Sequence, residues 1–322
     1  MGDAIQRTAI SSLQEVRNLI KELPAPDLES LKKFTLHDAQ LTKPMGSLGK
    51  LETLVEWLAS WQAQYPPRLN HPRTSVFAGN HGVAKYGVSA FPSSVTSEMV
   101  KNFVEGGAAV NQLCKTFDAD LRVYELGLEQ PTSDFTTEPA MTEEDCVGAM
   151  AYGMMAIEPG LDVICIGEMG IGNTTSAAAV SMGLFGGKAE EWVGRGTGIT
   201  PETLEKKIKL VQAAVDFHLP QTEDPLSIFA ALGGLELAAI IGAIIAARLA
   251  RVPVILDGFA CTASAAVLFA LDPTTIDHCL VAHRSVEPGH TKLLELMCKD
   301  PLFDLGLRLG EGSGATLALG IL

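Results

Sequence analysis

One glutamate in the sequence stands where a carboxylate could remove a proton from a bound substrate. Glu311 lies in Gly310-Glu311-Gly312-Ser313-Gly314, at a junction between a loop and a helix, and apolar residues flank it. Desolvation in such a place raises the pKa of a carboxyl group toward the range that suits proton abstraction. The alternative is a purely structural role, in which a glutamate at a helix start stabilises the helix dipole. Both interpretations of Glu311 stay open from the residues alone.

Two glycine-rich segments could bind a phosphate or a carboxylate. Residues 167–176 follow an apolar run and lead into an alanine-rich helix, whose unpaired N–H groups would face an anion. An ordinary turn between a strand and a helix is the alternative here. Residues 194–198 precede a second helix, which carries Lys206, Lys207 and Lys209. These lysines cannot share one helix face, so we expect most of their charge on the solvated surface.

Several nucleotide-binding signatures are absent. Gly187-Lys188 is followed by Ala189 and lacks the upstream glycine of a P-loop, and Ile199 stands where a dinucleotide-binding GxGxxG motif has its last glycine. Asp257-Gly258 has one acid where type I phosphoribosyltransferases have two. The sequence therefore disfavours both a Rossmann-type oxidoreductase and a magnesium pyrophosphate substrate.

Composition and charge indicate a protein that binds small molecules. Of the 322 residues, 47% are hydrophobic and 19% are charged, which excludes a disordered chain. The formal net charge of −14 repels nucleic acid and anionic lipid, so we expect neither as a partner, and local donors must hold any phosphate. The 6 cysteines form no CxxC pair and have no histidine at zinc spacing, so we expect reduced thiols and no metal.

The apolar stretch over residues 226–247 is not expected to span a membrane. Glu236 lies inside it, and Gly233-Gly234 divides it into pieces shorter than the ~20 residues that a bilayer requires. The N-terminal residues have neither the basic nor the apolar region of a signal peptide. We therefore expect a cytoplasmic protein.

The elements that must position these residues change in type along the chain. The first part predicts helices over residues 11–23, after Pro26-Asp27, and over residues 47–61, which suggests a small helical domain over residues 1–70. Residues 71–322 predict an α/β catalytic domain, with strands over 74–78, 121–126, 163–166, 252–256 and 279–282 and helices between them. Such alternation predicts a parallel, Rossmann-like sheet covered by helices on both faces.

Four of these strands precede polar loops that contain glycine, at residues 79–83, 167–176, 257–262 and 283–289. In an open parallel sheet such loops meet at the carboxyl edge, where ligands bind, so we expect one site there. The last helical pattern begins near Ser313 and still continues at Leu322. We therefore expect the natural chain to extend beyond Leu322.

Six segments resemble, in the same order, segments of the nicotinate-nucleotide:dimethylbenzimidazole phosphoribosyltransferase family. The first is Lys43-Pro44-Met45-Gly46-Ser47-Leu48-Gly49-Lys50-Leu51-Glu52, which is similar to the KPxGSLGxLE stretch of the family. The others are residues 80–83 with 87–88, 167–175, 233–236, 254–259 and 308–315. Because the similarity runs from about residue 24 to the end, it covers nearly the whole chain.

The resemblance implies transfer of 5-phosphoribosyl from nicotinate mononucleotide to 5,6-dimethylbenzimidazole or a related base. The products are nicotinate and α-ribazole 5′-phosphate, which provides the lower ligand of cobamides. Glu311 is then the base, and Glu168 is a second carboxyl that helps it or stabilises the cationic ribosyl centre. The pyridinium ring leaves as a neutral molecule, so neither a metal nor a cofactor is expected. A non-catalytic nucleotide- or base-binding regulatory protein of the same fold is the alternative.

The resemblance also implies binding residues and a homodimer. The residues expected at the phosphate are Gly170, Ile171, Gly172, Gly196, Thr197 and Lys207, of which the lysine reaches across a dimer interface in the family. Phe91 and Met99 stand where the family has polar residues, and with Met169 and Leu309 they are expected to line an apolar slot for the base. The family fold adds the C-terminal helix to the small N-terminal helical domain.

Overall fold

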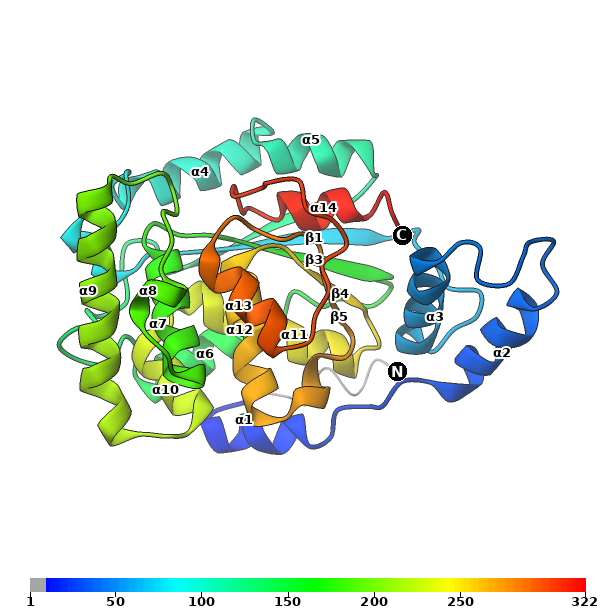
Figure 1. Cartoon of the computed structure of the whole chain (residues 1–322), viewed down its shortest axis with the longest axis horizontal. Coiled ribbons are helices and arrows are strands. Elements are labelled where there is room, and N and C mark those ends of the chain that lie inside the picture. The colour runs from blue at the N-terminus through cyan, green and yellow to red at the C-terminus, as the bar shows by residue number, and fades with distance from the viewer. Residues whose placement is uncertain (1–9) are drawn as a thin grey trace.

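A computed structural model of the chain describes residues 10–322, and a parallel sheet lies at its centre (Figure 1). Its strands are β1 (Pro72–Gly79), β2 (Asp120–Leu126), β3 (Val163–Met169), β4 (Val254–Leu256) and β5 (Cys279–Val281), in the order β2-β1-β3-β4-β5. Every neighbouring pair is parallel. The five predicted strands and the predicted parallel α/β fold are confirmed. The order reverses direction between β1 and β3, which is where sheets of this kind bind ligands.

Helices connect the strands and cover the sheet. They are α1 (Leu13–Ile20), α2 (Leu28–Asp38), α3 (Lys50–Gln62), α4 (Ser94–Glu105), α5 (Ala109–Thr116), α6 (Glu143–Met154), α7 (Asn173–Phe185), α8 (Ala189–Trp192), α9 (Pro201–His218), α10 (Pro225–Leu232), α11 (Leu235–Leu249), α12 (Phe259–Leu271), α13 (Pro288–Leu296) and α14 (Ser313–Ala318). Three short 3-10 helices complete the described chain, η2 (Gly82–Tyr86), η3 (Leu219–Gln221) and η4 (Pro273–Ile276).

Both faces of the sheet are buried, as a parallel sheet requires. On one face, Val163 and Cys165 of β3 pack against α14, and Val76 of β1 packs against α4 and α5. On the other face, Ile164 and Ile166 belong to the large core formed with α6, α7, α11 and α12. Successive side chains of a strand point to opposite faces, so a continuous apolar run such as β3 fits this position.

The long apolar stretch of the sequence forms two buried helices rather than one. Helix α10 ends at Leu232, Gly233 and Gly234 form the break, and α11 begins at Leu235. Almost all of α11 is buried between the sheet and its neighbours. Within residues 10–322, no helix combines the length and the apolar character needed to cross a bilayer.

Helix boundaries follow the local signals at most ends. Thr142 caps α6 with a reciprocal hydrogen bond to Asp145, and Thr200 caps α9 ahead of Pro201. Helix α14 is shorter than its apolar pattern, because it ends at Ala318 and a turn follows. Gly320 lies against the ring of Phe117 and leaves no space there for a side chain.

The N-terminal helices differ in what they contact. Helices α2 and α3 pack on each other and extend to one side of the sheet (Figure 1). Helix α1 packs instead on α6, and its residues Leu13, Val16 and Leu19 belong to the core of the sheet. Helix α14 packs on α5, β3 and β4. The division into residues 1–70 with the C-terminal helix and residues 71–322 stays a prediction.

Candidate active site

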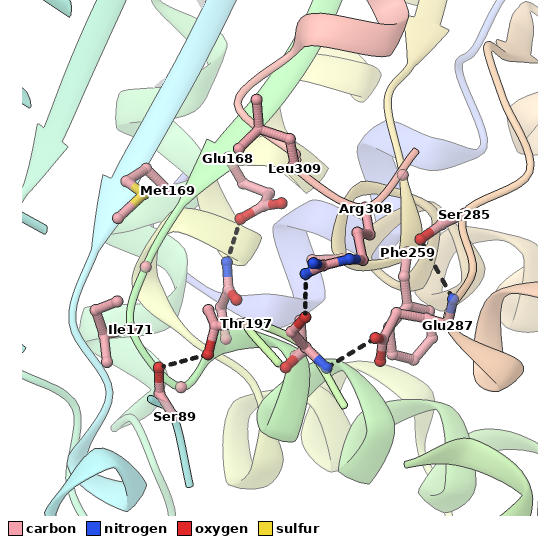
Figure 2. A pocket seen from close by; sticks show the side chains of 18 of the residues that line it. Ser89, Glu168, Met169, Ile171, Thr197, Phe259, Ser285, Glu287, Arg308 and Leu309 are labelled. Carbon is pink, nitrogen blue, oxygen red and sulfur yellow. Dashed lines mark hydrogen bonds between the residues drawn. The ribbon is translucent and has the colours of Figure 1, made fainter. Parts of the chain in front are cut away.

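A cavity lies at the carboxyl edge of the sheet, where the loops after β1, β3, β4 and β5 meet the segment before α14 (Figure 2). The residues that line it are Val88, Ser89, Glu168, Met169, Gly170, Ile171, Gly172, Asn173, Thr174, Gly196, Thr197, Gly258, Phe259, Ala260, His283, Ser285, Glu287, Arg308, Leu309 and Gly310. The predicted convergence of the strand-end loops is therefore confirmed. A second cavity adjoins the first, and three residues line both of them: Gly196, Glu287 and Arg308.

Glu311 follows the lining residue Gly310 and is held by the backbone around it. Its φ of 63° lies in the left-handed region, which a residue other than glycine adopts only when its surroundings impose it. The constraint comes from both sides. The Glu311 N–H donates to the carbonyl of Glu168 at 3.2 Å, and the buried Asp257 carboxylate accepts from the N–H groups of Gly312 and Ala315 at 3.0 and 2.9 Å.

Burial changes the acidity of both glutamates. Burial, assisted by the negative charge of Asp257, raises the pKa of Glu311 to about 7. Burial also raises the pKa of Glu168 to about 8, with the charges of Asp257, Glu236 and Glu311 acting in the same direction. The amide of Asn173 donates to Glu168 (Figure 2) and opposes that shift. At neutral pH Glu168 is therefore mostly protonated, whereas Glu311 can readily gain or lose a proton.

The turn Gly170–Gly172 precedes α7 and forms one side of the cavity. At the start of that helix, Lys207 Nζ donates to Thr174 Oγ1 at 2.7 Å and to the Gly194 carbonyl at 3.3 Å. Lys207 is buried, and burial lowers its pKa to about 8 although Glu287 acts against that change. A helix start with a lysine beside it is a suitable place for a phosphate.

The second predicted phosphate segment lies beside the start of α7, because a Cβ at Gly196 would lie 3.1 Å from Thr174 Oγ1 and 3.6 Å from Lys207 Nζ. The hydroxyls of Thr197 and Ser89 are 3.1 Å apart, and Thr197 also accepts from the N–H of Ala90. The N–H of Gly196 donates to the buried Glu287 carboxylate at 2.8 Å (Figure 2). The exposed Arg308 donates to the Gly196 carbonyl at 3.5 Å. Both predicted phosphate segments thus lie beside Lys207, and the Gly196 N–H has the Glu287 carboxylate as its acceptor.

Known proteins with similar chains give this arrangement a chemical context. A family model described as "Phosphoribosyltransferase" matches residues 23–322. A nicotinate-nucleotide--dimethylbenzimidazole phosphoribosyltransferase of Brucella anthropi is 54% identical over 307 residues, which are 95% of this chain and 91% of that protein. The protein of the same name from Allorhizobium ampelinum is 53% identical over 307 residues, 95% of this chain and 90% of that one.

The fold comparison agrees. The crystal structure of CobT from Thermus thermophilus superposes with a TM-score of 0.85 at 39% sequence identity, over 91% of this chain and 93% of that chain. The chain belongs to the nicotinate-nucleotide–dimethylbenzimidazole phosphoribosyltransferase family. Membership in this family of phosphoribosyltransferases supports an enzyme over a non-catalytic binding protein, and it confirms the resemblance of the six sequence segments.

Most residues that the family resemblance assigned to the site lie together. Glu168, Met169, Gly170, Ile171, Gly172, Gly196, Thr197 and Leu309 all line the cavity. Glu311 and Lys207 are not among the lining residues. Glu311 directly follows the lining residue Gly310, and Lys207 is bonded within its own chain, to Thr174. This lysine therefore lies beside the predicted phosphate site of its own chain, and a contact across a dimer interface stays a prediction.

Two of the four predicted base-binding residues do not line this cavity. Phe91 is half exposed and lies two residues beyond Ser89, to which its N–H donates. Met99 is partly buried on α4 and packs with Met169 in a small apolar cluster. Their role in base binding stays a prediction. Met169 and Leu309 do lie at the cavity, on either side of Glu168 in Figure 2.

Sequence reasoning missed several charged groups of the site. No motif marks Asp257, Glu287 or Arg308 as functional. Asp257 and Glu287 lie in two of the predicted strand-end loops, and Arg308 lies in a segment that resembles the family. The signal that could have found them is topological, because each of the two acids follows a strand of the parallel sheet. Among residues 10–322, no group of three or more histidine, cysteine, aspartate or glutamate side chains is placed to hold a metal ion.

Proposed function

We propose that this chain transfers 5-phosphoribosyl from nicotinate mononucleotide to 5,6-dimethylbenzimidazole or a related base. The products are nicotinate and α-ribazole 5′-phosphate, the precursor of the cobamide lower ligand. The names of the similar proteins from Brucella anthropi and Allorhizobium ampelinum support this choice of substrates. The observation that carries the proposal is a buried glutamate, Glu311, held at positive φ directly after Gly310, which lines a cavity together with the turn Gly170–Gly172.

The bonds that change suit such a site. The bond between C1′ and the pyridinium nitrogen breaks, and its electron pair stays on the nitrogen, so nicotinate leaves with a neutral ring. A benzimidazole nitrogen forms the new bond to C1′ from the opposite face, which converts the β to the α configuration. The other benzimidazole nitrogen then loses its proton to the Glu311 carboxylate. A base with a pKa near 7 is well matched to this transfer at neutral pH.

Glu168 has a different role because its carboxyl is mostly protonated at neutral pH. A neutral carboxyl can donate a hydrogen bond to a substrate, but it contributes little charge to stabilise a cationic ribosyl centre. We therefore assign Glu168 the helping role. The turn Gly170–Gly172, Gly196, Thr197 and Lys207 hold the phosphate, which anchors the donor with C1′ toward the glutamates.

We also propose that the protein is a homodimer. Exposed apolar side chains on α2 and on the segment that follows it, among them Leu36 and Met45, support a protein contact there. Because Lys207 is bonded within its own chain, the dimer is not needed to bring this lysine to the phosphate. The cytoplasmic location predicted from the sequence stays a prediction.

An assay with both substrates tests the proposed reaction. The protein is incubated with nicotinate mononucleotide and 5,6-dimethylbenzimidazole, and the products are separated by liquid chromatography. We expect nicotinate and α-ribazole 5′-phosphate in equal amounts. A regulatory protein of this fold would bind nicotinate mononucleotide without releasing nicotinate. That result would contradict the proposal. If nicotinate is released, replacement of the benzimidazole by purines and phenols identifies the preferred acceptor.

A further inference from the structure

A buried histidine and a buried glutamate form a pair next to the cavity, and the reaction outlined above does not use them. His81 follows β1, and Glu236 lies in the first turn of α11. His81 Nε2 and Glu236 Oε1 are 2.6 Å apart, and both side chains are 0% exposed. The two residues are 155 positions apart in the sequence, so the fold alone brings them together.

Three glycines from different segments make room for this pair. A Cβ atom at Gly79 would lie 2.7 Å from Glu236 Oε2, and one at Gly234 would lie 2.2 Å from His81 Cε1. A Cβ at Gly170 would lie 3.2 Å from Glu236 Oε1 and 2.6 Å from the Gly79 carbonyl. The pair therefore fills the space between the end of β1, the phosphate-binding turn and the start of α11.

Stability does not explain why polar side chains occupy this space. His81 Nδ1 and Glu236 Oε2 have no hydrogen-bond partner among residues 10–322, and a buried polar atom without a partner destabilises a fold. Apolar residues of similar volume often replace a buried polar pair with no loss of stability. A role in the neighbouring site is therefore the better explanation.

The turn Gly170–Gly172 packs closely against the pair. Besides the contact at Gly170, a Cβ at Gly172 would lie 3.4 Å from Cβ of His81. The same turn is held by hydrogen bonds at both ends. The N–H of Ile171 donates to the hydroxyl of Thr96, and the Gly170 carbonyl accepts from the N–H of Asn173. A shift of His81 or Glu236 would therefore move this turn, which lines the cavity.

We propose that His81 and Glu236 form a positioning pair, which holds the turn Gly170–Gly172 in the shape that receives the phosphate of the donor. This inference rests on the proposed function, because that function places the phosphate at this turn. Several backbone N–H groups must point at one anion together, so a small displacement of the turn weakens all of these contacts at once. Neither residue of the pair lines the cavity.

Leucine substitutions test the proposal, since leucine fills a similar volume without polar atoms. Calorimetry measures binding of nicotinate mononucleotide and of inorganic phosphate to the wild type, Glu236→Leu, His81→Leu and the double variant. We expect each single variant to raise Kd for nicotinate mononucleotide about tenfold. The double variant should also raise it about tenfold rather than about a hundredfold, because either change removes the same pair. Glu236→Gln keeps the hydrogen bond to His81 and should stay within about threefold of the wild type.

Two comparisons separate positioning from a general loss of structure. Binding of nicotinate riboside, which lacks the phosphate, should be unchanged in the leucine variants. The midpoint of urea unfolding should be unchanged in the double variant, because that variant leaves neither side chain of the pair buried without its partner. Glu158→Leu, which removes a hydrogen bond to Arg73 near the amino end of β1, should leave phosphate binding unchanged. Equal losses for the donor with and without phosphate, or wild-type binding in either leucine variant, would overturn the proposal.

The two proposals fail in different ways. Absence of nicotinate release from the wild type would contradict the phosphoribosyl transfer. In that case, loss of inorganic phosphate binding in Glu236→Leu would still support the positioning pair. If Glu236→Leu does not fold, His81→Leu gives the same comparison from β1.

Discussion

At the scale of single residues, the proposed chemistry depends on Glu311, a buried carboxyl whose pKa of about 7 suits a base. Glu311→Gln keeps the shape of the side chain but cannot accept the proton. We expect kcat to fall by about 10²–10⁴, with Kd for nicotinate mononucleotide unchanged. Steady-state kinetics and calorimetry measure the two quantities. Glu295→Gln, on the exposed surface of α13, is the matched control and should keep full activity. Unchanged turnover in Glu311→Gln would show that Glu311 is not the base.

The pH dependence of kcat should reflect the two glutamates. Glu311 must be ionised to accept a proton, so kcat rises as pH passes about 7. Glu168 must be protonated to donate a hydrogen bond, so kcat falls as pH passes about 8. Because the two groups interact, the two observed pKa values belong to the pair. The profile is measured at saturating donor.

Glu168→Gln is the control for the alkaline side of this profile. It removes the titrating group, so the fall above about pH 8 should disappear while the rise near pH 7 remains. A fall that persists in Glu168→Gln would assign that side to another group, of which Lys207, with its pKa of about 8, is the first to test.

At the scale of elements, Asp257 connects β4 to the start of α14. Its carboxylate accepts from the N–H groups of Gly312 and Ala315, and its charge adds to the effect of burial in raising the pKa of Glu311. In Asp257→Asn the amide turns an N–H group toward one of these donors. We expect a loss of about 1–3 kcal/mol in the free energy of unfolding, measured in urea.

The same variant should move the acidic side of the pH profile of kcat to lower pH, because Glu311 loses a negative neighbour. Asp272→Asn is the control for this change. Asp272 also accepts a backbone N–H, from Thr274, but at the exposed start of η4. Asparagine is an equally good residue at such a helix start, so stability and pH profile should both stay as in the wild type. An unshifted profile in Asp257→Asn would show that its charge does not act on Glu311.

At the scale of the whole molecule, the site lowers stability in a pH-dependent way. The pKa of Glu168 is raised to about 8 in the folded state from its ordinary value of 4.5, so the folded protein binds the proton more tightly than the unfolded chain between these values. Stability contributed by this proton is fully present below pH 4.5 and is lost as pH rises through 8. Glu168→Gln should therefore raise Tm by about 3 °C or more at about pH 9 and leave it nearly unchanged at about pH 4. Calorimetry at both pH values measures this, and an equal shift at both would contradict it.

The second prediction at this scale concerns assembly. Leu36 is 58% exposed on α2 and Met45 is 94% exposed in the segment before α3, on a part of the chain that extends from the sheet (Figure 1). Sedimentation should give about twice the mass of one chain. Leu36→Glu with Met45→Glu should give the mass of one chain with unchanged circular dichroism. A dimer that survives both changes would place the contact elsewhere, and Val104→Glu on the exposed side of α4 then tests a different surface.

Local patterns in the sequence determined the elements and their order. The apolar runs before Gly79, Glu168 and Asp257 each formed a parallel strand, and glycine at 233 and 234 divided the apolar stretch, because these signals act between neighbouring residues. Family resemblance indicated Glu311 as a candidate base and the turn Gly170–Gly172 as a candidate phosphate site. Neither kind of signal gave the partners of these residues.

Only the tertiary structure decided how the site residues affect one another. It brought Asp257 to the N–H groups beyond Glu311, turned Lys207 to Thr174 of its own chain, and placed His81 against Glu236. Such pairs join residues that are far apart along the chain, and their pKa values depend on burial and on charges across the fold. Residue types and spacing contain no measure of either quantity, since desolvation and Coulomb interactions depend on distances in space.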